Sequence, residues 1–350
     1  MSFFEPIWKI FTDDIGIDLG TANTKIAIRN EGIIATEPSV VAINKKTKEI
    51  LSVGTQAKKM LGRTPANIIA VRPLKDGVIS DFDATRDMIQ YFIELAHKHS
   101  HKFYKLPRPR VVIGIPSSAT EVGKKAVKDA AKNAGAREAY VIEEPMAAAI
   151  GAGLPITEAQ GSMVVDIGGG TSDIAIISLG GIVVDKTIQI AGDEMDEEIV
   201  KYVRNKYNLL IGERLAEDVK IQIGSAFPSK EETYEVRGRD ILLGVPKTIT
   251  ITSLEVREAI ICQLDLIAAS ISAALEEAPP EILADISEYG IYLAGGGALI
   301  KGIQKYFEDK IKIKFIVAPD PISCVVKGTQ ILLEDLDLLA SVQVDDDELL

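Results

Sequence analysis

The sequence predicts an α/β protein built from two related domains, and three observations carry that prediction. The chain has 350 residues, which exceeds one typical hydrophobic core, and 47% of its residues are apolar. An Asp-x-Gly motif at Asp18 recurs at Asp166, each time between two apolar runs of strand character. The run Val111–Ile115 is almost continuously apolar, which is typical of a strand in a sheet covered on both faces.

Composition limits the class of partner. The formal net charge of −12 argues against nucleic acid as the main partner, because neutralising phosphates requires a basic face. A nucleotide bound as its Mg²⁺ complex is compatible with an acidic chain. The two cysteines, Cys262 and Cys324, predict buried small residues in a reducing cytosol. No run reaches the roughly 18 apolar residues that we expect of a membrane-spanning helix.

The first 13 residues predict an amphipathic helix. Its apolar side carries Phe3, Phe4, Ile7, Trp8 and Phe11. Two interpretations stay open, a tail docked on its own domain and an amphipathic segment in a lipid interface. We do not expect a signal peptide, because Glu5 interrupts the segment and no basic start precedes it.

The repeated motif predicts two hairpins whose turns bind phosphate. The first copy spans Asp18–Lys25 and the second Asp166–Asp173, and the two align without a gap. Glycine lets backbone N–H groups approach a polyphosphate closely, and an acid at a strand end can hold Mg²⁺ through water. One copy alone would be only a moderate signal, because glycine-rich turns between strands are more often plain turns. Two copies predict two domains that face one phosphate site, each contributing an acid and a turn.

Between the two motifs the chain predicts alternating strands and helices. The expected elements are a strand-rich stretch over 32–44, helices over Thr55–Leu61, Thr85–His97 with Asp83 as its cap, and Ala119–Ala134, and a strand over Tyr140–Ile142. That last strand leads into Glu144 and Pro145. A carboxylate between a strand end and a helix start is placed for site chemistry. The alternative is a solvated glutamate that caps the helix.

Two features near residue 100 stand apart from this pattern. His97, His99 and His101 are the chain's three histidines, and their alternate spacing suits imidazoles on one side of a strand. Their position at a helix end favours a solvated loop over a metal site. The segment Phe103-Tyr104-Lys105-Leu106 is a short apolar loop that is either tucked in or exposed for a purpose.

After the second motif, further strands and helices are predicted. They are a strand over 182–190, helices over Glu194–Tyr207 and Arg214–Ile223, strands over Glu235–Val245 and Thr248–Thr252, and a long helix capped by Ser253 that ends near Glu277. The strand Ile291–Ala294 precedes three glycines and a helix over Ala298–Lys310. That arrangement predicts a site for phosphate or ribose. Residues 342–350 predict a solvated acidic tail.

Motifs of other nucleotide-binding classes are missing. Neither G-x-x-x-x-G-K-[ST] nor G-x-G-x-x-G occurs in the sequence. A P-loop NTPase and a dinucleotide-dependent dehydrogenase are therefore not favoured.

Two Asp-x-Gly hairpins, a linking helix and a late strand followed by three glycines together resemble the actin-like ATPases. That superfamily includes actin, heat-shock chaperone ATPases and sugar kinases. The resemblance narrows to the MreB family of bacterial shape-determining actin homologues and extends from about residue 14 to about residue 335. The segments that carry it are Asp14–Thr24, Glu143–Gly151, Val164–Thr171, Ala191–Asp196 and Ile211–Arg214.

The resemblance implies an actin-like ATPase fold of two lobes, each with a duplicated ribonuclease-H-like core, and four subdomains around a central nucleotide cleft. The implied division is an amphipathic membrane-binding segment 1–13, lobe I over 14–150 (core 14–33 and 76–150, small subdomain 34–75), lobe II over 151–322 (core 151–187 and 251–322, small subdomain 188–250), a C-terminal helix 323–341 that returns to lobe I, and the acidic tail 342–350.

The resemblance also implies roles for residues. Asp18 and Asp166 would organise Mg²⁺ and its waters. Glu144 matches the catalytic glutamate of the family, and Thr171 would help this glutamate to hold the attacking water. The implied nucleotide contacts are Gly20, Thr21, Ala22, Asn23, Gly168, Gly169 and Gly170 at the phosphates, Glu217 and Lys220 at ribose and base, and Gly295, Gly296, Gly297 and Ala298 at the adenosine. Lys25 departs from the family, which usually has an apolar residue there. It is either a direct phosphate ligand, as in actin, or solvated.

The implied function is a membrane-associated ATPase that binds and hydrolyses ATP with Mg²⁺, polymerises into filaments and organises cell-wall synthesis to maintain rod shape. It would be cytoplasmic and peripheral at the inner face of the cell membrane, with Phe103 and Tyr104 as a second lipid contact. The implied partners are other copies of the chain, inner-membrane lipid and membrane proteins of the cell-elongation machinery, with no nucleic acid.

Proteins of the same fold have other functions, and three of these are alternatives for this chain. A chaperone would need a C-terminal substrate domain, and a sugar kinase would need an acidic base in a sugar pocket. A scaffold that binds ATP without hydrolysing it is a third possibility, against which the complete set of Asp18, Glu144, Asp166 and Thr171 argues. The preference for ATP over GTP rests on the resemblance.

Overall fold

The computed structural model describes residues 14–344 except residues 62, 76–77, 100–107 and 228–229. The chain divides into two compact units. Unit 1 comprises the residues up to Glu158, Leu179–Gly181 and the segment from Ser323 onward, and unit 2 comprises Ala159–Ser178 and Ile182–Ile322. The finer division into four subdomains stays a prediction.

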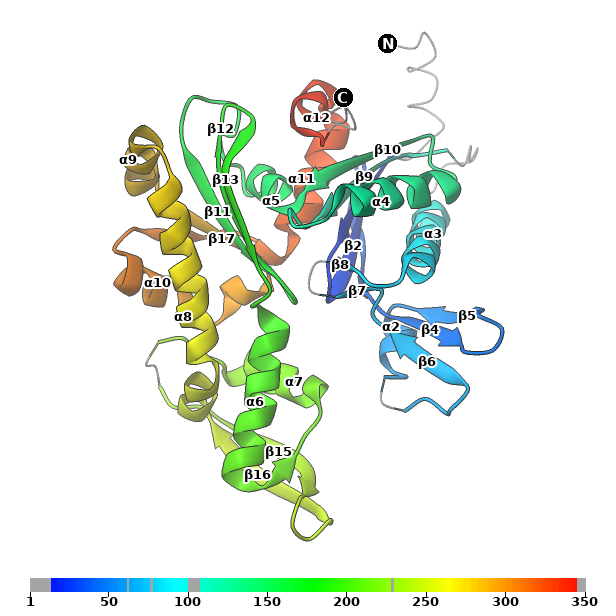
Figure 1. Ribbon diagram of the computed structural model, residues 1–350, viewed down its shortest axis with the longest axis vertical. Coiled ribbons are helices and arrows are strands. Elements are labelled where there is room, and N and C mark those ends of the chain that lie inside the picture. Colours follow the sequence, from blue (N-terminus) through cyan, green and yellow to red (C-terminus); the bar gives the residue numbers. More distant parts are fainter. Residues whose placement is uncertain (1–13, 62, 76–77, 100–107, 228–229, 345–350) are drawn as a thin grey trace. The chain divides into compact units, whose positions relative to one another are not determined.

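Unit 1 is built around a five-stranded sheet with the order β10-β9-β1-β2-β3 (Figure 1). Strands β1, β9 and β10 are parallel, and β2 and β3 continue the sheet in antiparallel fashion. Their bounds are β1 Ile15–Leu19, β2 Asn23–Ile28, β3 Gly32–Pro38, β9 Arg110–Ile115 and β10 Glu138–Glu143. All six residues of β9 are buried, as the continuous apolar run predicts for a strand covered on both faces.

The remaining elements of unit 1 are helices and two small sheets. The helices are α2 Thr55–Lys58, α3 Phe82–His99, α4 Glu121–Asn133, α5 Glu144–Gly151, α11 Cys324–Glu334 and α12 Leu336–Val342. The small sheets contain β4 Val41–Asn44, β5 Ile50–Val53 and β6 Ile68–Val71, and the pair β7 Leu74–Lys75 with β8 Val78–Ile79. Side chains of α3, such as Met88, Ile89 and Phe92, pack on the sheet in one apolar core.

Helix α11 returns the C-terminal part of the chain to unit 1, where it packs against α5. Two glycines make this approach possible. A Cβ at Gly151 would overlap the carbonyl of Cys324, and a Cβ at Gly328 would overlap the carbonyl of Ala147. Any larger residue at either position would force the two helices apart.

Unit 2 repeats the sheet of unit 1. Its order is β13-β12-β11-β17-β18, with antiparallel β11–β12 and parallel β11, β17 and β18. The bounds are β11 Ser162–Ile167, β12 Ser172–Ser178, β13 Gly181–Ile188, β17 Ile291–Ala294 and β18 Phe315–Val317. The two hairpins share one register, because Asp18 lies opposite Lys25 and Asp166 lies opposite Asp173. The repeat seen in the sequence is therefore a repeat of backbone structure.

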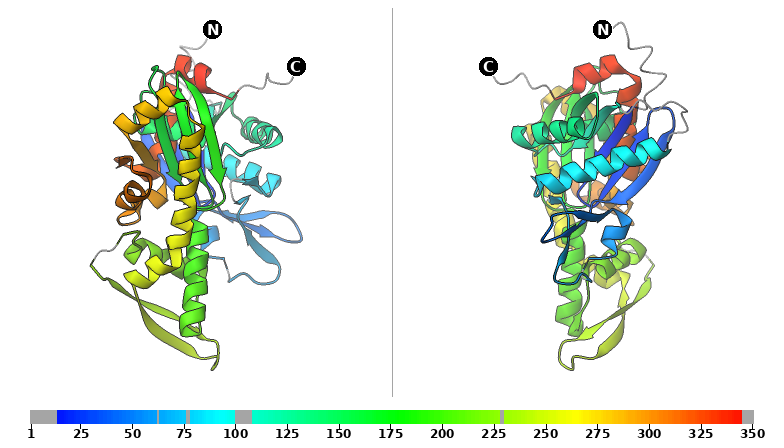
Figure 2. Two further views of the ribbon diagram at one scale, coloured as in Figure 1. Left: turned by 60° about the vertical axis from the view of Figure 1, so that its left-hand side comes forward. Right: turned by 90° about the vertical axis from the view of Figure 1, so that its right-hand side faces the viewer.

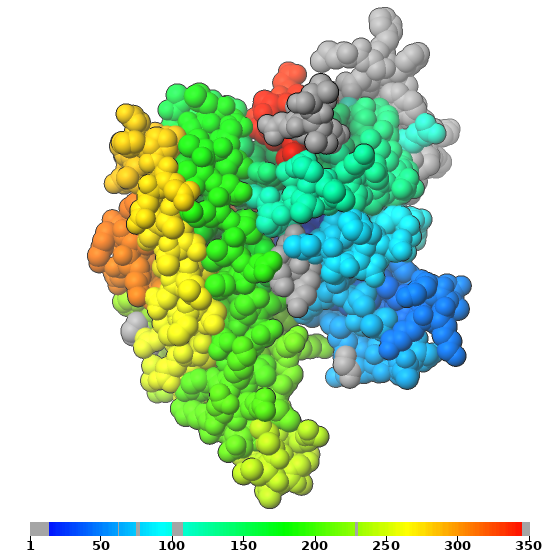
Figure 3. All heavy atoms as spheres, in the orientation of Figure 1, coloured from blue at the N-terminus to red at the C-terminus, as the bar shows by residue number. Residues whose placement is uncertain are grey.

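Helices and a second sheet complete unit 2 (Figure 2). They are α6 Gly192–Tyr207, β14 Leu209–Leu210, α7 Glu213–Ile223, β15 Thr233–Asp240, β16 Pro246–Thr252, α8 Ser253–Glu277, α9 Pro280–Tyr289, η1 Gly296–Leu299, α10 Ile303–Ile311 and η2 Pro321–Ser323. Strands β14, β15 and β16 form a small antiparallel sheet. The turn between β15 and β16 projects from the unit in Figure 3 and exposes Leu242 and Leu243.

Helix α8 is long and apolar enough to cross a membrane by length and composition, contrary to our expectation that no segment would be. One such helix is weak evidence for a membrane span, because the core helix of a soluble protein passes the same test. Its residues Ile260, Leu264 and Ile267 belong to the apolar core of unit 2.

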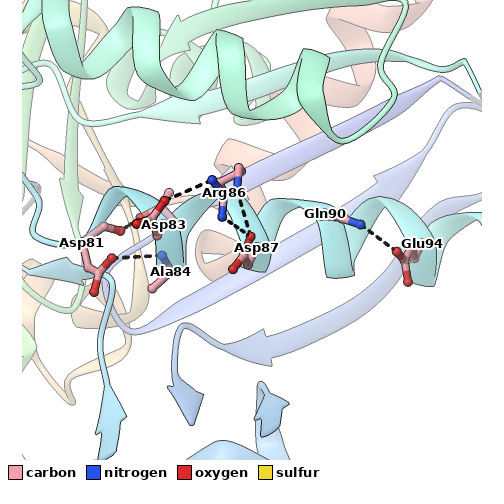
Figure 4. Close-up of polar contacts among 8 residues, drawn as sticks. Asp81, Asp83, Ala84, Arg86, Asp87, Gln90 and Glu94 are labelled. Atoms are coloured by element: carbon pink, nitrogen blue, oxygen red, sulfur yellow. Dashed lines mark hydrogen bonds and ion pairs between the residues drawn. The ribbon is translucent and has the colours of Figure 1, made fainter. Parts of the chain in front are cut away.

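Two predicted helix caps are wrong by one or two residues. Asp81, not Asp83, caps α3, since its carboxylate accepts a hydrogen bond from the Ala84 N–H at 3.0 Å (Figure 4). Asp83 instead pairs with Arg86 inside the first turn. Thr252, not Ser253, caps α8, because its hydroxyl accepts from the Glu255 N–H.

Two further expectations are corrected. The glycines after β17 lead into the short 3₁₀ helix η1, and the α-helix begins only at Ile303, not at Ala298. Cys262 is exposed, whereas Cys324 is buried as predicted.

Candidate functional site

In unit 1, the acid of the first motif forms an ion pair. Asp18 lies near the end of β1, and Lys25 lies opposite it on β2. The Lys25 Nζ is 2.8 Å from Asp18 Oδ2, and both side chains are buried. Lys25 is only 9% exposed, which excludes the interpretation that it is solvated. The lysine places a positive charge in the predicted phosphate site.

The turn that follows Asp18 is held in a fixed shape by Ser39, a residue that the sequence did not single out. The Ser39 hydroxyl donates to the Gly20 carbonyl at 2.6 Å and lies 2.9 Å from the Thr24 hydroxyl. The Ser39 N–H donates to the Ala22 carbonyl. A Cβ at Gly20 would lie 2.8 Å from the Asn23 carbonyl, so the turn requires glycine there. We call this turn, residues 20–23, the first phosphate loop after its predicted role.

Glu144 begins helix α5 directly after strand β10 and is 8% exposed. Its burial excludes the alternative of a solvated capping residue. Ile142 and Asp18 both lie in register with Gly114 of β9, so the ends of three parallel strands bring Glu144 and Asp18 to one edge of the sheet. Pro145 follows at the first turn of the helix, where proline is tolerated because the N–H of any other residue there would have no partner within the helix.

In unit 2, Asp166 lies near the end of β11 and is buried. The opposite residue is Asp173, whose carboxylate accepts from the Thr187 hydroxyl at 2.6 Å. Residues 168–171, which we call the second phosphate loop after their predicted role, form a turn closed by a hydrogen bond from the Gly168 N–H to the Thr171 carbonyl. Thr171 is buried as well.

The N-terminus of α6 fixes the second phosphate loop. The Gly192 N–H donates to the Gly168 carbonyl at 3.2 Å, and the Asp193 N–H donates to the Gly169 carbonyl at 2.7 Å. These donors belong to the helix end whose N–H groups lack partners within the helix. The loop carbonyls are thereby turned to α6.

Of the two predicted contacts on α7, Glu217 is half-buried, and Lys220 joins a buried network. The Lys220 Nζ donates to the Gly192 carbonyl at 2.6 Å and lies 2.8 Å from Asp196 Oδ2. Burial raises the pKa of the Asp196 carboxyl from 3.8 to about 7, although the Lys220 ammonium acts in the opposite direction. The sequence showed Asp196 within a family segment and gave it no role.

The glycines after β17 pack against the second acid. Gly295 has a φ of 78°, and a Cβ there would overlap Asp166 Oδ1 and the Ile167 carbonyl. A Cβ at Gly297 would overlap the Ile167 side chain. Gly295 and Gly297 therefore lie beside Asp166 and Ile167, and their contact with adenosine stays a prediction.

Some predicted residues cannot be placed. The apolar residues of the N-terminal segment and of the loop near residue 104 lie outside the described residues, namely Phe3, Phe4, Ile7, Trp8, Phe11, Phe103 and Tyr104. His97 and His99 lie in the last turn of α3, which excludes their alignment along one side of a strand. Among the described residues, no group of three or more His, Cys, Asp or Glu side chains could hold a metal ion.

A family model described as MreB/Mbl protein matches residues 12–341. The chain belongs to the MreB/Mbl family. It is 49% identical over 334 residues to the cell shape-determining protein MreB of Escherichia coli K12, covering 94% of this chain and 95% of that protein. It is 46% identical over 331 residues to the cell shape-determining protein Mbl of Bacillus subtilis 168, covering 94% and 98%.

Solved structures of similar proteins have the same fold. MreB5 of Spiroplasma citri bound to AMPPNP superimposes with a TM-score of 0.86 at 40% identity, covering 93% of this chain and 97% of that one. The MamK double helical filament gives a TM-score of 0.78 at 25% identity, covering 93% and 99%. The predicted actin-like fold is thereby confirmed.

Proposed function

We propose that this chain is a cytoskeletal ATPase that binds Mg-ATP, assembles into filaments at the inner face of the cell membrane and organises cell-wall synthesis to maintain rod shape. The observation that carries the proposal is the duplicated hairpin, with buried Asp18 and Asp166 at equivalent positions of two sheets. Membership of the MreB/Mbl family supports it, as does the AMPPNP bound to MreB5.

The nucleotide would be held by backbone as much as by side chains. Residues 20–23 and 168–171 would bind the phosphates through N–H groups, since both loops have their carbonyls engaged by other groups. Lys25 would contact a phosphate oxygen. Glu217, Lys220 and residues 295–298 would contact ribose, base and adenosine.

The donor set fits Mg²⁺. This ion is usually bound by one or two carboxylates together with substrate phosphates and water, and carboxylate oxygens are the ligands it prefers. Asp18 and Asp166 are buried carboxylates near the ends of β1 and β11, and Asp18 would share its charge between Lys25 and the ion. When bound, Mg²⁺ would neutralise charge on the phosphate oxygens.

Hydrolysis would proceed by in-line attack of water on the γ-phosphate. Glu144 would orient the water and accept its proton, and the Thr171 hydroxyl would help to hold it. The backbone amides of the two phosphate loops would stabilise the charge that develops on the transferred group. The burial of Glu144 supports this role, since a buried carboxylate keeps a defined position.

Membrane attachment is proposed from the sequence of residues 1–13 and 103–104. Burying one large apolar side chain contributes roughly 1.5–3 kcal/mol, and ordering the segment offsets part of that gain. A single copy would therefore bind lipid weakly. A filament presents many copies, so its avidity would greatly exceed the affinity of one chain.

Pelleting of the purified full-length chain tests these parts together. We expect a sedimentable polymer with ATP and Mg²⁺ and none without nucleotide. Anionic liposomes should co-sediment with the polymer, and a variant lacking residues 2–11 should still assemble but lose the liposomes. Sedimentation that does not respond to nucleotide would contradict the ATPase assignment. Full liposome binding by the truncated chain would contradict the anchor.

A further inference from the structure

Asp196 belongs to a buried chain of contacts that connects α7 to the second phosphate loop. Its Oδ2 lies 2.8 Å from the Lys220 Nζ, which donates to the Gly192 carbonyl at 2.6 Å. The Gly192 N–H in turn donates to the Gly168 carbonyl. Three side-chain or backbone contacts therefore lead from a carboxylate on α6 to the loop that follows Asp166.

The packing around Gly192 leaves this chain little freedom. A Cβ at Gly192 would lie 3.1 Å from the Lys220 Nζ and 3.3 Å from the Gly168 carbonyl oxygen. The ammonium and the loop thus both lie close to Gly192, the ammonium bonded to its carbonyl and the loop to its N–H. A shift of Lys220 by a fraction of an ångström would be transmitted to Gly168, because close-packed groups cannot move independently.

An ammonium has three N–H donors, and within the described part of the chain two of them meet Asp196 and Gly192. The third is left for an acceptor on the nucleotide. Lys220 alone, on a flexible four-carbon stem, would occupy many positions, and the carboxylate restricts it to one. Asp196 is 5% exposed, so this restraint is not weakened by water.

We propose that Asp196 is a positioning residue of the nucleotide site, which holds the Lys220 ammonium against Gly192 and couples the adenosine contact on α7 to the second phosphate loop. This inference rests on the proposed function, because it assumes that Lys220 contacts a bound nucleotide. Its consequence is that nucleotide affinity depends on the charge of Asp196.

That charge changes near neutral pH. Burial raises the pKa of the Asp196 carboxyl to about 7, and the nearby carboxylates of Glu217 on α7 and Asp193 on α6 add to the rise, while Lys220 opposes it. Above pH 7 the carboxylate is charged and holds Lys220. Below pH 7 it is neutral, and its hydrogen bond from the Lys220 ammonium loses the contribution of the negative charge. Affinity should therefore increase with pH.

The test measures the affinity of the full chain for AMPPNP with Mg²⁺ between pH 6 and 8.5. A charge-assisted hydrogen bond of this kind changes affinity by roughly tenfold or more. We expect the wild type to bind about tenfold more tightly at pH 8 than at pH 6. Asp196→Asn should bind weakly throughout and lose this part of the pH dependence.

Two further variants make the test specific. Glu197→Gln removes a like charge from the neighbouring, exposed position of α6 and should behave as the wild type. Lys220→Met should also lose the pH dependence, and adding Asp196→Asn to it should change nothing more, since the two residues act as one unit.

The outcomes are distinguishable. If the wild type binds no AMPPNP at any pH, the proposed function fails. If it binds, and Asp196→Asn shows the affinity and pH profile of the wild type, Asp196 does not position Lys220. If Asp196→Asn does not fold, Lys220→Met decides, and an unchanged pH profile in that variant overturns the proposal.

Discussion

Asp196 should make the stability of the nucleotide-free protein fall as the pH rises. Its pKa is about 7 in the folded protein and 3.8 as a model value, because burial disfavours the charged form. Between pH 4 and 7 the unfolded chain releases this proton while the folded chain keeps it. The free energy of unfolding therefore decreases across that window and stays low above pH 7.

The magnitude follows from the same pKa. A carboxyl whose pKa moves from 3.8 to about 7 costs the folded state up to about 4 kcal/mol when it is charged, at ~1.4 kcal/mol per pH unit. Asn keeps an oxygen that can accept from Lys220 and carries no charge. At pH 8, Asp196→Asn should be more stable than the wild type, with Tm higher by roughly 10 °C at most.

Thermal and urea unfolding at pH 5 and pH 8, followed by circular dichroism, measures this effect. The difference between variant and wild type isolates Asp196, because every other titrating group is common to both. We expect a small difference at pH 5 and a large one at pH 8. A variant that is less stable than the wild type at pH 8 would refute the reasoning, since it would mean that the ion pair stabilises the fold.

Three substitutions test the rest of the site. Glu144→Gln should bind AMPPNP normally and release phosphate at least roughly 10²-fold more slowly than the wild type, so that its filaments persist in a pelleting assay. Phosphate release at the wild-type rate would reject the catalytic role. Lys25→Met should weaken AMPPNP binding about tenfold and reduce its dependence on salt, and unchanged values of both would show that Lys25 serves Asp18 alone. Ser39→Ala should lower the free energy of unfolding by about 1–3 kcal/mol and weaken nucleotide binding, because the Gly20 carbonyl loses its side-chain donor; equal affinity would show that the first phosphate loop keeps its shape without Ser39.

Much of the fold was predictable because the repeat leaves a strong local pattern. An acid, glycines and flanking apolar runs at constant spacing fix both hairpins, and their registers agree residue by residue. The apolar run of β9 likewise identifies a strand that is buried on both faces. Because these signals are local in the sequence, the strands can be predicted from them without knowledge of the tertiary structure.

The two errors in the helix caps lie where two nearby residues have the same chemistry. Asp81 and Asp83 can both cap a helix, as can Thr252 and Ser253, and only the backbone geometry decides between them. Ser39 and Asp196 were missed for another reason. Their roles depend on partners that are distant in sequence, at Gly20 and Lys220, and the local sequence pattern does not indicate those contacts.

The two hairpins share their backbone but not their electrostatics. Lys25 and Asp173 hold the same position in register, opposite Asp18 and Asp166 respectively. In unit 1 the acid is thus neutralised by an ammonium 2.8 Å away, whereas in unit 2 it faces a second acid. A carboxylate that is paired with an ammonium attracts a cation less strongly than a carboxylate that lies opposite a second acid. Duplication alone would make Asp18 and Asp166 equal ligands. We therefore expect substitution of Asp166 to weaken Mg²⁺ binding more than substitution of Asp18, and we expect Lys25, beside Asp18, to be the group that contacts a phosphate.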